Sequence, residues 1–195
     1  NSDPPVFSDE YALDYVVTNQ QYGFKVLGRW TVDHKNSSGG MNQRERTDAY
    51  NKSLNPKVEV KDFGNHVDYQ WWSTHTPACV QEPLKGSQAA WVVDPSAKMI
   101  DGPAGVEVWR VAHADISQCV DFYVRGSGAS REKLPYQLLY WGNCTSGTAS
   151  QPGEVLGQNN TYFNFSVADT ADSLFHPAAG EKCPPAPPPP APPSP

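Results

Sequence analysis

Short segments in which apolar and polar residues alternate recur along most of this chain, between clusters of turn-forming residues. In the first of them, Tyr11, Leu13, Tyr15 and Val17 follow one another at every second position. This spacing places their side chains on one face of an extended strand. No long segment repeats its apolar residues every 3.6 positions, as an amphipathic helix does. The sequence therefore predicts an all-β fold, a curved antiparallel sheet of half-barrel or barrel-like form.

The expected strands are closely spaced and rich in β-branched and aromatic residues. Residues 36–40 predict a hairpin-type loop, and the charged residues after them predict an exposed strand. Minor helical pieces are expected around residues 8–13, 95–100 or 168–174. Strands are expected at residues 11–17, 21–33, 41–50, 58–63, 67–71, 89–93, 106–112, 119–125, 136–141 and 162–168.

The two ends of the chain differ from its middle. Residues 1–6 predict an extended lead, residues 7–183 a single disulfide-bonded β domain, and residues 184–195 a proline-rich tail or linker. Because proline lacks an N–H donor, the tail is expected to stay out of helices and sheet ladders. It should form a polyproline II rod of roughly 35–40 Å. The rod is either an inert spacer or a docking or glycosylated stalk, with candidate contacts at Pro187, Pro188, Pro189 and Pro190.

Charge and hydropathy exclude two kinds of partner. The formal net charge is −6, and the basic residues are scattered instead of forming the cationic face that a nucleic-acid binder usually presents. No run of eighteen apolar residues is present, so no membrane span is expected. The chain starts at Asn1 without a methionine, as a mature protein does after signal-peptide removal, although a fragment starts in the same way.

Four cysteines are far apart in the sequence, and none belongs to a C-x-x-C pair. This spacing argues against a zinc knuckle or a thioredoxin-type site, and an even number suits two disulfides. A hairpin centred on residues 126–133 places Cys119 opposite Cys144, within reach of a disulfide. We therefore expect Cys119 to pair with Cys144 and Cys79 to pair with Cys183.

Asn-x-Ser/Thr sequons are unusually frequent for a chain of 195 residues. Together with the cysteines, they predict a secreted, extracellular glycoprotein. The candidate N-glycosylation sites are Asn36, Asn51, Asn143, Asn159 and Asn164.

Catalytic signatures are missing from the sequence. It has no G-x-S-x-G motif, phosphate-binding loop or paired metal-ligating histidines. His66 and Asp68 share a strand face, which is more typical of surface structure than of a metal site. Glu107 and Asp121 lie on expected strands and would matter for glycoside hydrolysis only if they met in a cleft. We expect a non-enzymatic protein without a metal or another cofactor.

Aromatic residues concentrate at Tyr69, Trp71 and Trp72. Adjacent residues of a strand point to opposite faces, so one tryptophan is expected to enter the core. The other is expected to face solvent, a ligand, a glycan or a protein partner. These three residues are therefore candidate ligand or partner contacts.

The order of several motifs resembles the ependymin-related family of secreted glycoproteins. They are residues 28–33 (Gly-Arg-Trp-Thr-Val-Asp), a charged strand around residues 44–46, the aromatic strand at 69–72, Cys79 after it, and Val-Trp at 108–109. The resemblance implies a half-barrel similar to bacterial lipoprotein carriers, with a hydrophobic pocket. It also implies lipid or hydrophobic-ligand binding, matrix association and calcium-sensitive behaviour, although the chain has no motif for a calcium site. The match spans roughly residues 11–183.

The proline tail departs from that family and is similar in composition to hydroxyproline-rich glycoproteins of plant and algal matrices. The proline tail and the sequons favour the function of a structural subunit of extracellular matrix or surface fibres, with the tail as an interaction rod. The expected partners are other copies of the chain or matrix glycoproteins. The family resemblance favours the alternative, a carrier that binds a lipid or another hydrophobic small molecule. Fold alone does not decide between these two functions.

Overall fold

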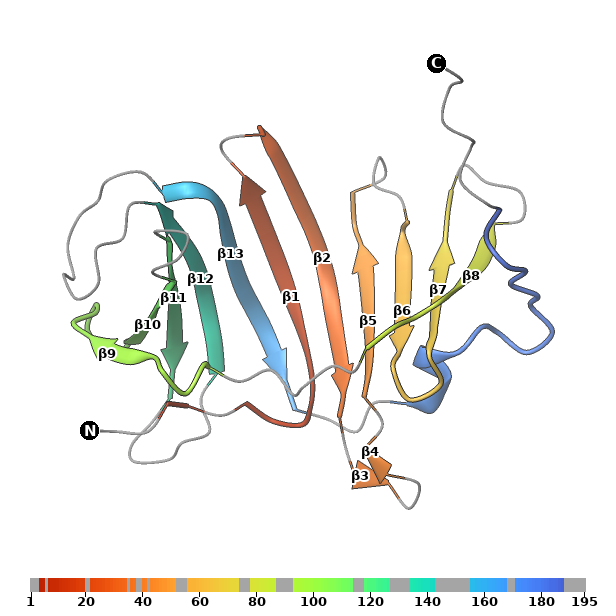
Figure 1. Cartoon of the computed structure of the whole chain (residues 1–195), viewed down its shortest axis with the longest axis horizontal. Coiled ribbons are helices and arrows are strands. Elements are labelled where there is room, and N and C mark those ends of the chain that lie inside the picture. Colours follow the sequence, from red (N-terminus) through yellow and green to blue (C-terminus); the bar gives the residue numbers. More distant parts are fainter. Residues whose placement is uncertain are drawn as a thin grey trace.

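The chain folds into one large β-sheet with a small two-stranded sheet beside it (Figure 1). The computed structural model describes residues 4–5, 7–19, 22–34, 36–37, 40–41, 43–51, 56–73, 78–86, 93–113, 118–126, 134–142, 155–167 and 171–187. Its elements are β1 (Glu10–Asn19), β2 (Phe24–Asp33), β3 (Asn36–Ser37), β4 (Gly40–Met41), β5 (Arg44–Ala49), β6 (Val58–Asp62), β7 (Val67–Trp71), β8 (Cys79–Pro83), β9 (Lys98–Ile100), β10 (Glu107–His113), β11 (Gln118–Arg125), β12 (Leu134–Gly142), β13 (Val155–Ser166) and the 3-10 turn η1 (Asp172–Phe175).

The large sheet has eleven antiparallel strands in the order β8-β7-β6-β5-β2-β1-β13-β12-β11-β10-β9. Strands β5 to β8 and strands β9 to β13 form two meanders, and β1 joins them by pairing with β2 and β13. The chain crosses from β8 at one end of the sheet to β9 at the other. Within the described residues these two strands do not pair, so the sheet is open. The prediction of an all-β, curved antiparallel sheet is confirmed (Figure 1).

Strand pairing assigns the side chains of the large sheet to two faces. Directly opposed residues of antiparallel strands share a face. Tyr11 is opposed to Val32, and Leu13 is opposed to Trp30, so these four residues lie on one face. We call it the aromatic face, and the other side of the sheet the opposite face. The registers of the remaining strands extend both faces across the whole sheet.

Two clusters of buried residues lie on the aromatic face. Phe7, Val93 and Ala97 pack on Trp109 and other residues of β10 and β11. The second cluster covers the middle of the sheet and consists of Tyr11, Leu13, Val32, Val120, Leu138 and Tyr162. Its buried apolar area supplies the main driving force for folding.

Several predictions of local structure are wrong. Residues 10–13 belong to strand β1 and residues 98–100 to strand β9, although helical pieces were expected there. Strand β8 was not expected at all. In each case pairing with a neighbouring strand overrides weak local preference. Of the strand expected at residues 89–93, only Val93 is described, and it is buried outside any strand. The 3-10 turn η1 overlaps the end of the helical piece expected at 168–174 and extends one residue beyond it.

The charged segment at residues 41–50 is not the exposed strand that was expected. Its strand β5 is internal, between β2 and β6, and Arg44 is buried. The guanidinium of Arg44 pairs with Asp33 and Asp172 and lies 4.6 Å from the ring centroid of Phe175. Because the C-terminal segment carries Asp172 and Phe175 onto this strand, local composition gave no sign of the burial.

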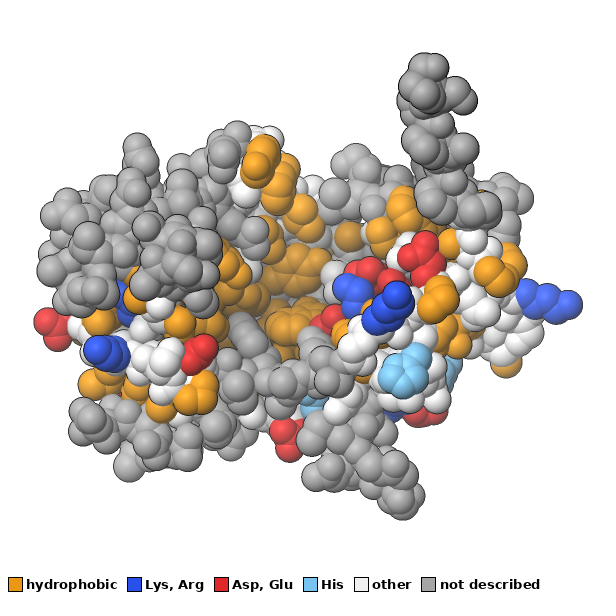
Figure 2. Space-filling view, viewed as in Figure 1, with side chains coloured by type: hydrophobic (Ala, Val, Ile, Leu, Met, Phe, Trp, Pro, Cys, Tyr) orange, Lys and Arg blue, Asp and Glu red, His pale blue; other side chains and the backbone are white. Residues whose placement is uncertain are grey.

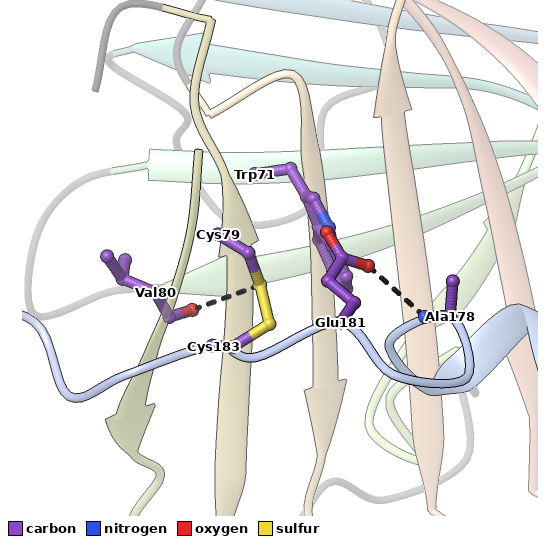
Figure 3. Close-up of a disulfide and its surroundings, with 6 residues drawn as sticks. All are labelled: Trp71, Cys79, Val80, Ala178, Glu181 and Cys183. Atoms are coloured by element: carbon purple, nitrogen blue, oxygen red, sulfur yellow. Dashed lines mark hydrogen bonds between the residues drawn. A yellow bond between two sulfur atoms is a disulfide. The ribbon is translucent and has the colours of Figure 1, made fainter. Parts of the chain in front are cut away.

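The predicted disulfide between Cys79 and Cys183 is present (Figure 3). Cys119 is fully buried and disulfide-bonded as well, but Cys144 lies outside the described residues. The expected hairpin register is wrong, because Trp141 and not Cys144 is opposed to Cys119. The two strands do pair about residues 126–133, with Arg125 opposed to Leu134, but this register, with its shift near Tyr123, leaves Cys144 three residues beyond the position opposite Cys119. The Cys119–Cys144 bond stays a prediction.

The base of the proline tail lies along the edge strand β8. The Gln81 backbone N–H donates to the Pro184 carbonyl at 2.9 Å, and the Ala186 N–H donates to the Gln81 carbonyl at 3.0 Å. Pro185 forms the resulting parallel bridge with Gln81. The expectation that the tract stays out of ladders is therefore wrong at its start. A proline carbonyl still accepts a hydrogen bond, and Ala186 supplies the N–H that proline lacks. Pro188, Pro189 and Pro190 lie outside the described residues.

The described part of the chain contains no helix with the length and hydropathy to cross a membrane.

Candidate functional site

The molecule is hollowed near its middle, over strands β13, β1 and β2, and hydrophobic side chains line the floor (Figure 2). These side chains belong to the aromatic face, because the opposite face of the same strands carries mostly polar and charged residues such as Asp14, Arg29 and Thr18. Five side chains at the border of the central cluster are only half-buried: Tyr15, Trp30, Phe122, Tyr140 and Phe165. They combine apolar area with partial access to solvent, as the lining of a ligand site does.

The described residues of this part of the aromatic face carry no charged side chain. Among the described residues of β1, β2, β11, β12 and β13, no Asp, Glu, Lys or Arg side chain lies on it. The charged residues of these strands, such as Asp14, Arg29 and Asp121, lie on the opposite face. A charge-free face avoids the desolvation cost that a buried ion would impose on an apolar ligand.

Aromatic packing holds the floor of the hollow. The ring of Tyr11 stacks on that of Phe165 with centroids 5.3 Å apart, and it meets Trp30 edge-on with centroids 5.8 Å apart. Phe165 points to the aromatic face because Asn164, at φ 50°, forms a bulge in β13. A bulge of this kind changes which side chain points to a given face. The bulge thus places Phe165 on the aromatic face and leaves Phe163 on the opposite face, where it is exposed.

Gly28 lets a tyrosine lie across the neighbouring strand. Gly28 is opposed to Tyr15 on the aromatic face. A Cβ atom at Gly28 would lie 2.5 Å from the Tyr15 hydroxyl oxygen and 2.4 Å from the Asp48 carbonyl oxygen. Both distances are too short for any side chain, so the position requires glycine. The missing side chain gives the Tyr15 ring its place over β2.

Tyrosine hydroxyls on the aromatic face stay protonated. Burial, the largest cause, raises the pKa of Tyr15 to about 12, and it also raises the pKa values of Tyr11, Tyr140 and Tyr162. The hydroxyl of Tyr162 accepts a hydrogen bond from the Asn160 amide at 3.3 Å. The hollow therefore contributes neutral polar atoms to an apolar surface at physiological pH.

The aromatic face becomes charged beyond β2. The Trp30 Nε1–H donates to Glu45 of β5 at 3.1 Å, and Lys61 of β6 pairs with Glu59 at 3.3 Å. Asp68 of β7 is buried, and its Oδ1 atom has no hydrogen-bond partner among the described residues. Burial is the largest cause that raises the pKa of Asp68, to about 6. The apolar surface therefore ends at β5, where the charged side chains that run from Glu45 to Asp68 begin.

The aromatic residues singled out in the sequence lie elsewhere. Trp71 and Trp72 were expected on opposite faces, but both line one pocket of about 490 Å³. Strand β7 ends at Trp71, so the strict alternation of a strand does not apply to Trp72. The pocket is between the opposite face of β5 to β7 and the C-terminal segment. Tyr69 is next to Trp71, with ring centroids 6.2 Å apart, and does not line it.

The described sequons point away from the hollow. Asn159 is on the opposite face, where its Oδ1 accepts from Gln137 at 3.1 Å. Asn164 is exposed and donates to Asp14 at 2.8 Å. Asn51 donates to the Lys25 carbonyl at 3.0 Å. The side chain of Asn36 and all of Asn143 lie outside the described residues, and glycosylation at each of the five sites stays a prediction.

The carboxylates and histidines considered from the sequence do not form a site. Asp121 is buried on the opposite face in an ion pair with Arg110, at 2.6 Å. Glu107 is on the aromatic face, where it accepts from Trp109 at 3.3 Å, so the sheet separates the two carboxylates. His66 lies in the turn before β7. In the described residues no three His, Cys, Asp or Glu side chains form a group able to hold a metal ion.

Sequence reasoning missed the residues of the hollow as a site. The alternation of Tyr11, Leu13 and Tyr15 was visible, but alternation alone does not show whether a face is covered. The available signal was composition. The same face holds aromatic residues on several strands, while the charges of those strands fall at the intervening positions.

The chain matches no protein-family model and no curated protein. Among solved structures it is similar to the LolA superfamily protein NE2245 from Nitrosomonas europaea. The identity is 10% over 88% of this chain and 91% of that chain, and the TM-score is 0.38. A likeness at this level carries no argument about function. The resemblance to the ependymin-related family stays a prediction.

Proposed function

We propose that this protein binds an apolar small molecule, such as a lipid acyl chain, in the hollow over the aromatic face. The observation that carries the proposal is the combination of half-buried aromatic side chains with a complete lack of charge on the described aromatic-face positions of five adjacent strands. Burying these side chains under an apolar ligand removes further apolar area from water, at roughly 25 cal/mol per Å².

The first test uses two phenylalanines of the same strand. Phe165 contributes to the hollow, whereas Phe163 is exposed on the opposite face. We expect the protein to take up a dansyl-labelled fatty acid, measured by the rise in dansyl fluorescence. Phe165→Ala should weaken this uptake about tenfold, as removal of an aromatic anchor does. Phe163→Ala should leave it unchanged. No uptake by the unaltered protein, or equal loss in both variants, contradicts the proposal.

A second pair of variants places a charge on either face of one strand. Val17 is opposed to Val26 on the aromatic face, and Val16 points to the opposite face. Both valines are half-buried, so Val17→Asp and Val16→Asp have similar intrinsic cost to the strand. Only Val17→Asp should reduce fatty-acid uptake, because an ion beside the hollow must be desolvated by the ligand. Urea unfolding of each variant separates this effect from lost stability.

A matrix subunit is the second candidate function, favoured by the base of the tail. The disulfide at Cys183 and the two hydrogen bonds around Gln81 fix the start of the tail on β8, as an interaction rod requires. Truncation after Ala186 should then abolish assembly of the secreted protein, measured by sedimentation velocity, while leaving fatty-acid uptake intact. Unchanged assembly removes this candidate. Secretion and glycosylation belong to the same proposal.

A further inference from the structure

The pocket beneath the C-terminal segment is separate from the hollow. Its floor is the opposite face of the sheet, at Arg46, Val58 and Trp71, and its wall is the C-terminal segment with His176 and Glu181. The hollow is on the aromatic face, so the sheet itself divides the two sites. The remaining residues around the pocket are Lys57, Trp72, Ser73, Ser173 and Ala178.

Fixed hydrogen bonds shape this pocket. The Trp71 Nε1–H donates to Glu181 Oε1 at 2.9 Å, and the Ala178 backbone N–H donates to Oε2 of the same carboxylate at 3.1 Å (Figure 3). The Cys79–Cys183 disulfide holds the same segment two residues further along. The positions of the Trp71 indole and the Glu181 carboxylate are therefore set before any ligand arrives, which lowers the entropy cost of binding.

The charged side chains around the pocket differ in whether they already have an ion-pair partner. Arg46 is neutralised by a two-point contact with Asp48, at 2.8 and 2.7 Å, and also donates to the Leu174 carbonyl. The Lys57 ammonium has no partner among the described residues. Glu181 accepts hydrogen bonds from two neutral donors and has no cationic partner among the described residues. The Lys57 ammonium and the Glu181 carboxylate thus remain available beside two indole rings.

This combination suits a ligand that is both apolar and rich in hydroxyl groups. A wholly apolar ligand would strip water from Lys57 and Glu181 without replacing their hydrogen bonds, which is costly. A pyranose ring has a face of C–H groups that packs on an indole and a rim of hydroxyls that donate to a carboxylate and accept from an ammonium. A volume of about 490 Å³ lies in the range of small-molecule sites.

We infer that this pocket binds a saccharide, with one sugar ring packed on Trp72 and hydroxyl groups bonded to Lys57 and Glu181. The saccharide is either free or part of a glycan on another copy of the chain, since the sequence carries five sequons. The inference does not depend on the proposed apolar ligand, because the two sites are on different faces.

The test uses cellobiose, lactose, diacetylchitobiose and digalacturonate as probes at millimolar concentration, with saturation-transfer NMR on the full chain. At least one sugar should bind. Trp72→Ala should weaken its binding about tenfold or more. Lys57→Ala should weaken binding about threefold, in keeping with loss of one hydrogen bond, and it removes no contact that holds the fold. Tyr22→Ala, an exposed aromatic residue outside the pocket, should have no effect.

Three further measurements make the outcome decisive. Urea unfolding should show that Trp72→Ala and Lys57→Ala are folded, whether or not the hollow takes up a fatty acid; where the unaltered protein does take up dansyl fatty acid, unchanged uptake in both variants separates this site from the hollow. Self-association that disappears after enzymatic removal of N-glycans assigns the saccharide to another copy, whereas sugar binding without self-association assigns a free saccharide. If no probe binds and no glycan-dependent association occurs, or if the Trp72→Ala and Lys57→Ala variants bind normally, the inference is wrong.

Discussion

The central strands and strands β5 to β8 belong to one sheet but carry most of their apolar side chains on opposite faces. In β1 and β2 the apolar side chains, such as Leu13 and Trp30, lie on the aromatic face. In β6 and β7 they lie on the opposite face, for example Val60 and Trp71, and the aromatic face carries charges. The phase of the apolar alternation thus changes between β2 and β6. One half of the sheet is left with a hollow lined by aromatic residues, and the other half is closed by the C-terminal segment.

The two halves are also held by different forces. The central strands depend on apolar burial and aromatic contacts around Tyr11 and Leu13. Strands β5 to β8 depend on the disulfide at Cys79 and on the ion pairs of the buried Arg44, of which the pair with Asp33 is itself buried. Removing a covalent or ionic contact should therefore lower the free energy of unfolding most in strands β5 to β8. Changing the packing of apolar side chains should lower it most in the central strands.

The largest effect is expected from removing the disulfide. In the double variant Cys79→Ser/Cys183→Ser, the unfolded chain gains the freedom of a loop that spans 104 residues. Loop-closure entropy predicts a loss of about 4–5 kcal/mol in the free energy of unfolding. Urea unfolding measures it. A loss below about 1 kcal/mol would mean that the noncovalent contacts of the segment suffice, and that the disulfide does not distinguish this half of the sheet.

Arg44→Met should have the next largest effect. It leaves the buried Asp33 carboxylate without its cation and removes the charge over the Phe175 ring. An unpaired buried charge costs about 3 kcal/mol. The matched control is Arg46→Met on the same strand, whose pair with Asp48 is more exposed and should be worth less than about 1 kcal/mol. An equal loss of stability in Arg44→Met and Arg46→Met would show that burial does not make the Arg44 pair contribute more than the more exposed Arg46 pair.

Gly28→Ala should cost about 2 kcal/mol, because the added methyl group overpacks the junction of β1, β2 and β5. The Tyr15 ring should be displaced from its place over β2, so the variant should also take up less dansyl fatty acid. Val26→Ala at the next aromatic-face position of β2 serves as the control for a change of volume. A Gly28→Ala variant with unaltered stability and uptake would contradict the close packing of Tyr15 on β2.

The smallest effect is expected at Asp68, and it depends on pH. The folded pKa of Asp68 is raised to about 6, above an unfolded value of about 3.9. The stability contributed by its neutral form is complete below the unfolded pKa and is lost as pH rises through the folded pKa. Asp68→Asn should therefore match the unaltered protein at pH 4 and exceed its stability by about 1–2 kcal/mol at pH 8. Glu82→Gln, an exposed neighbour on β8, should show no such difference.

Much of the sheet was predictable because most strands carry their own alternation. Strands β2, β7 and β11 were expected close to their observed bounds, since each holds several β-branched or aromatic residues. These strands are encoded locally and need no knowledge of distant contacts. The Cys79–Cys183 pair was expected by elimination, after a hairpin was expected to join Cys119 to Cys144; the pair is present, although the register of that hairpin is wrong.

The rest depends on contacts between distant segments. Strand β9 has only three residues and exists because it pairs with β10. Arg44 is buried by a segment 128 residues further along the chain. The bulge at Asn164, which brings Phe165 onto the aromatic face, has no clear local signal. The sequence therefore indicated aromatic contacts at Trp71 and Trp72 but not the hollow.

The most direct test of the central claim is tryptophan quenching by a dibrominated fatty acid, because bromine quenches only rings that it approaches closely. Trp30 borders the hollow, whereas Trp72 lines the pocket on the other face. We expect the fatty acid to quench the unaltered protein and Trp72→Phe equally, and the quenching to fall markedly in Trp30→Phe. Quenching that persists in Trp30→Phe and falls in Trp72→Phe would place the apolar ligand in the pocket and contradict binding in the hollow.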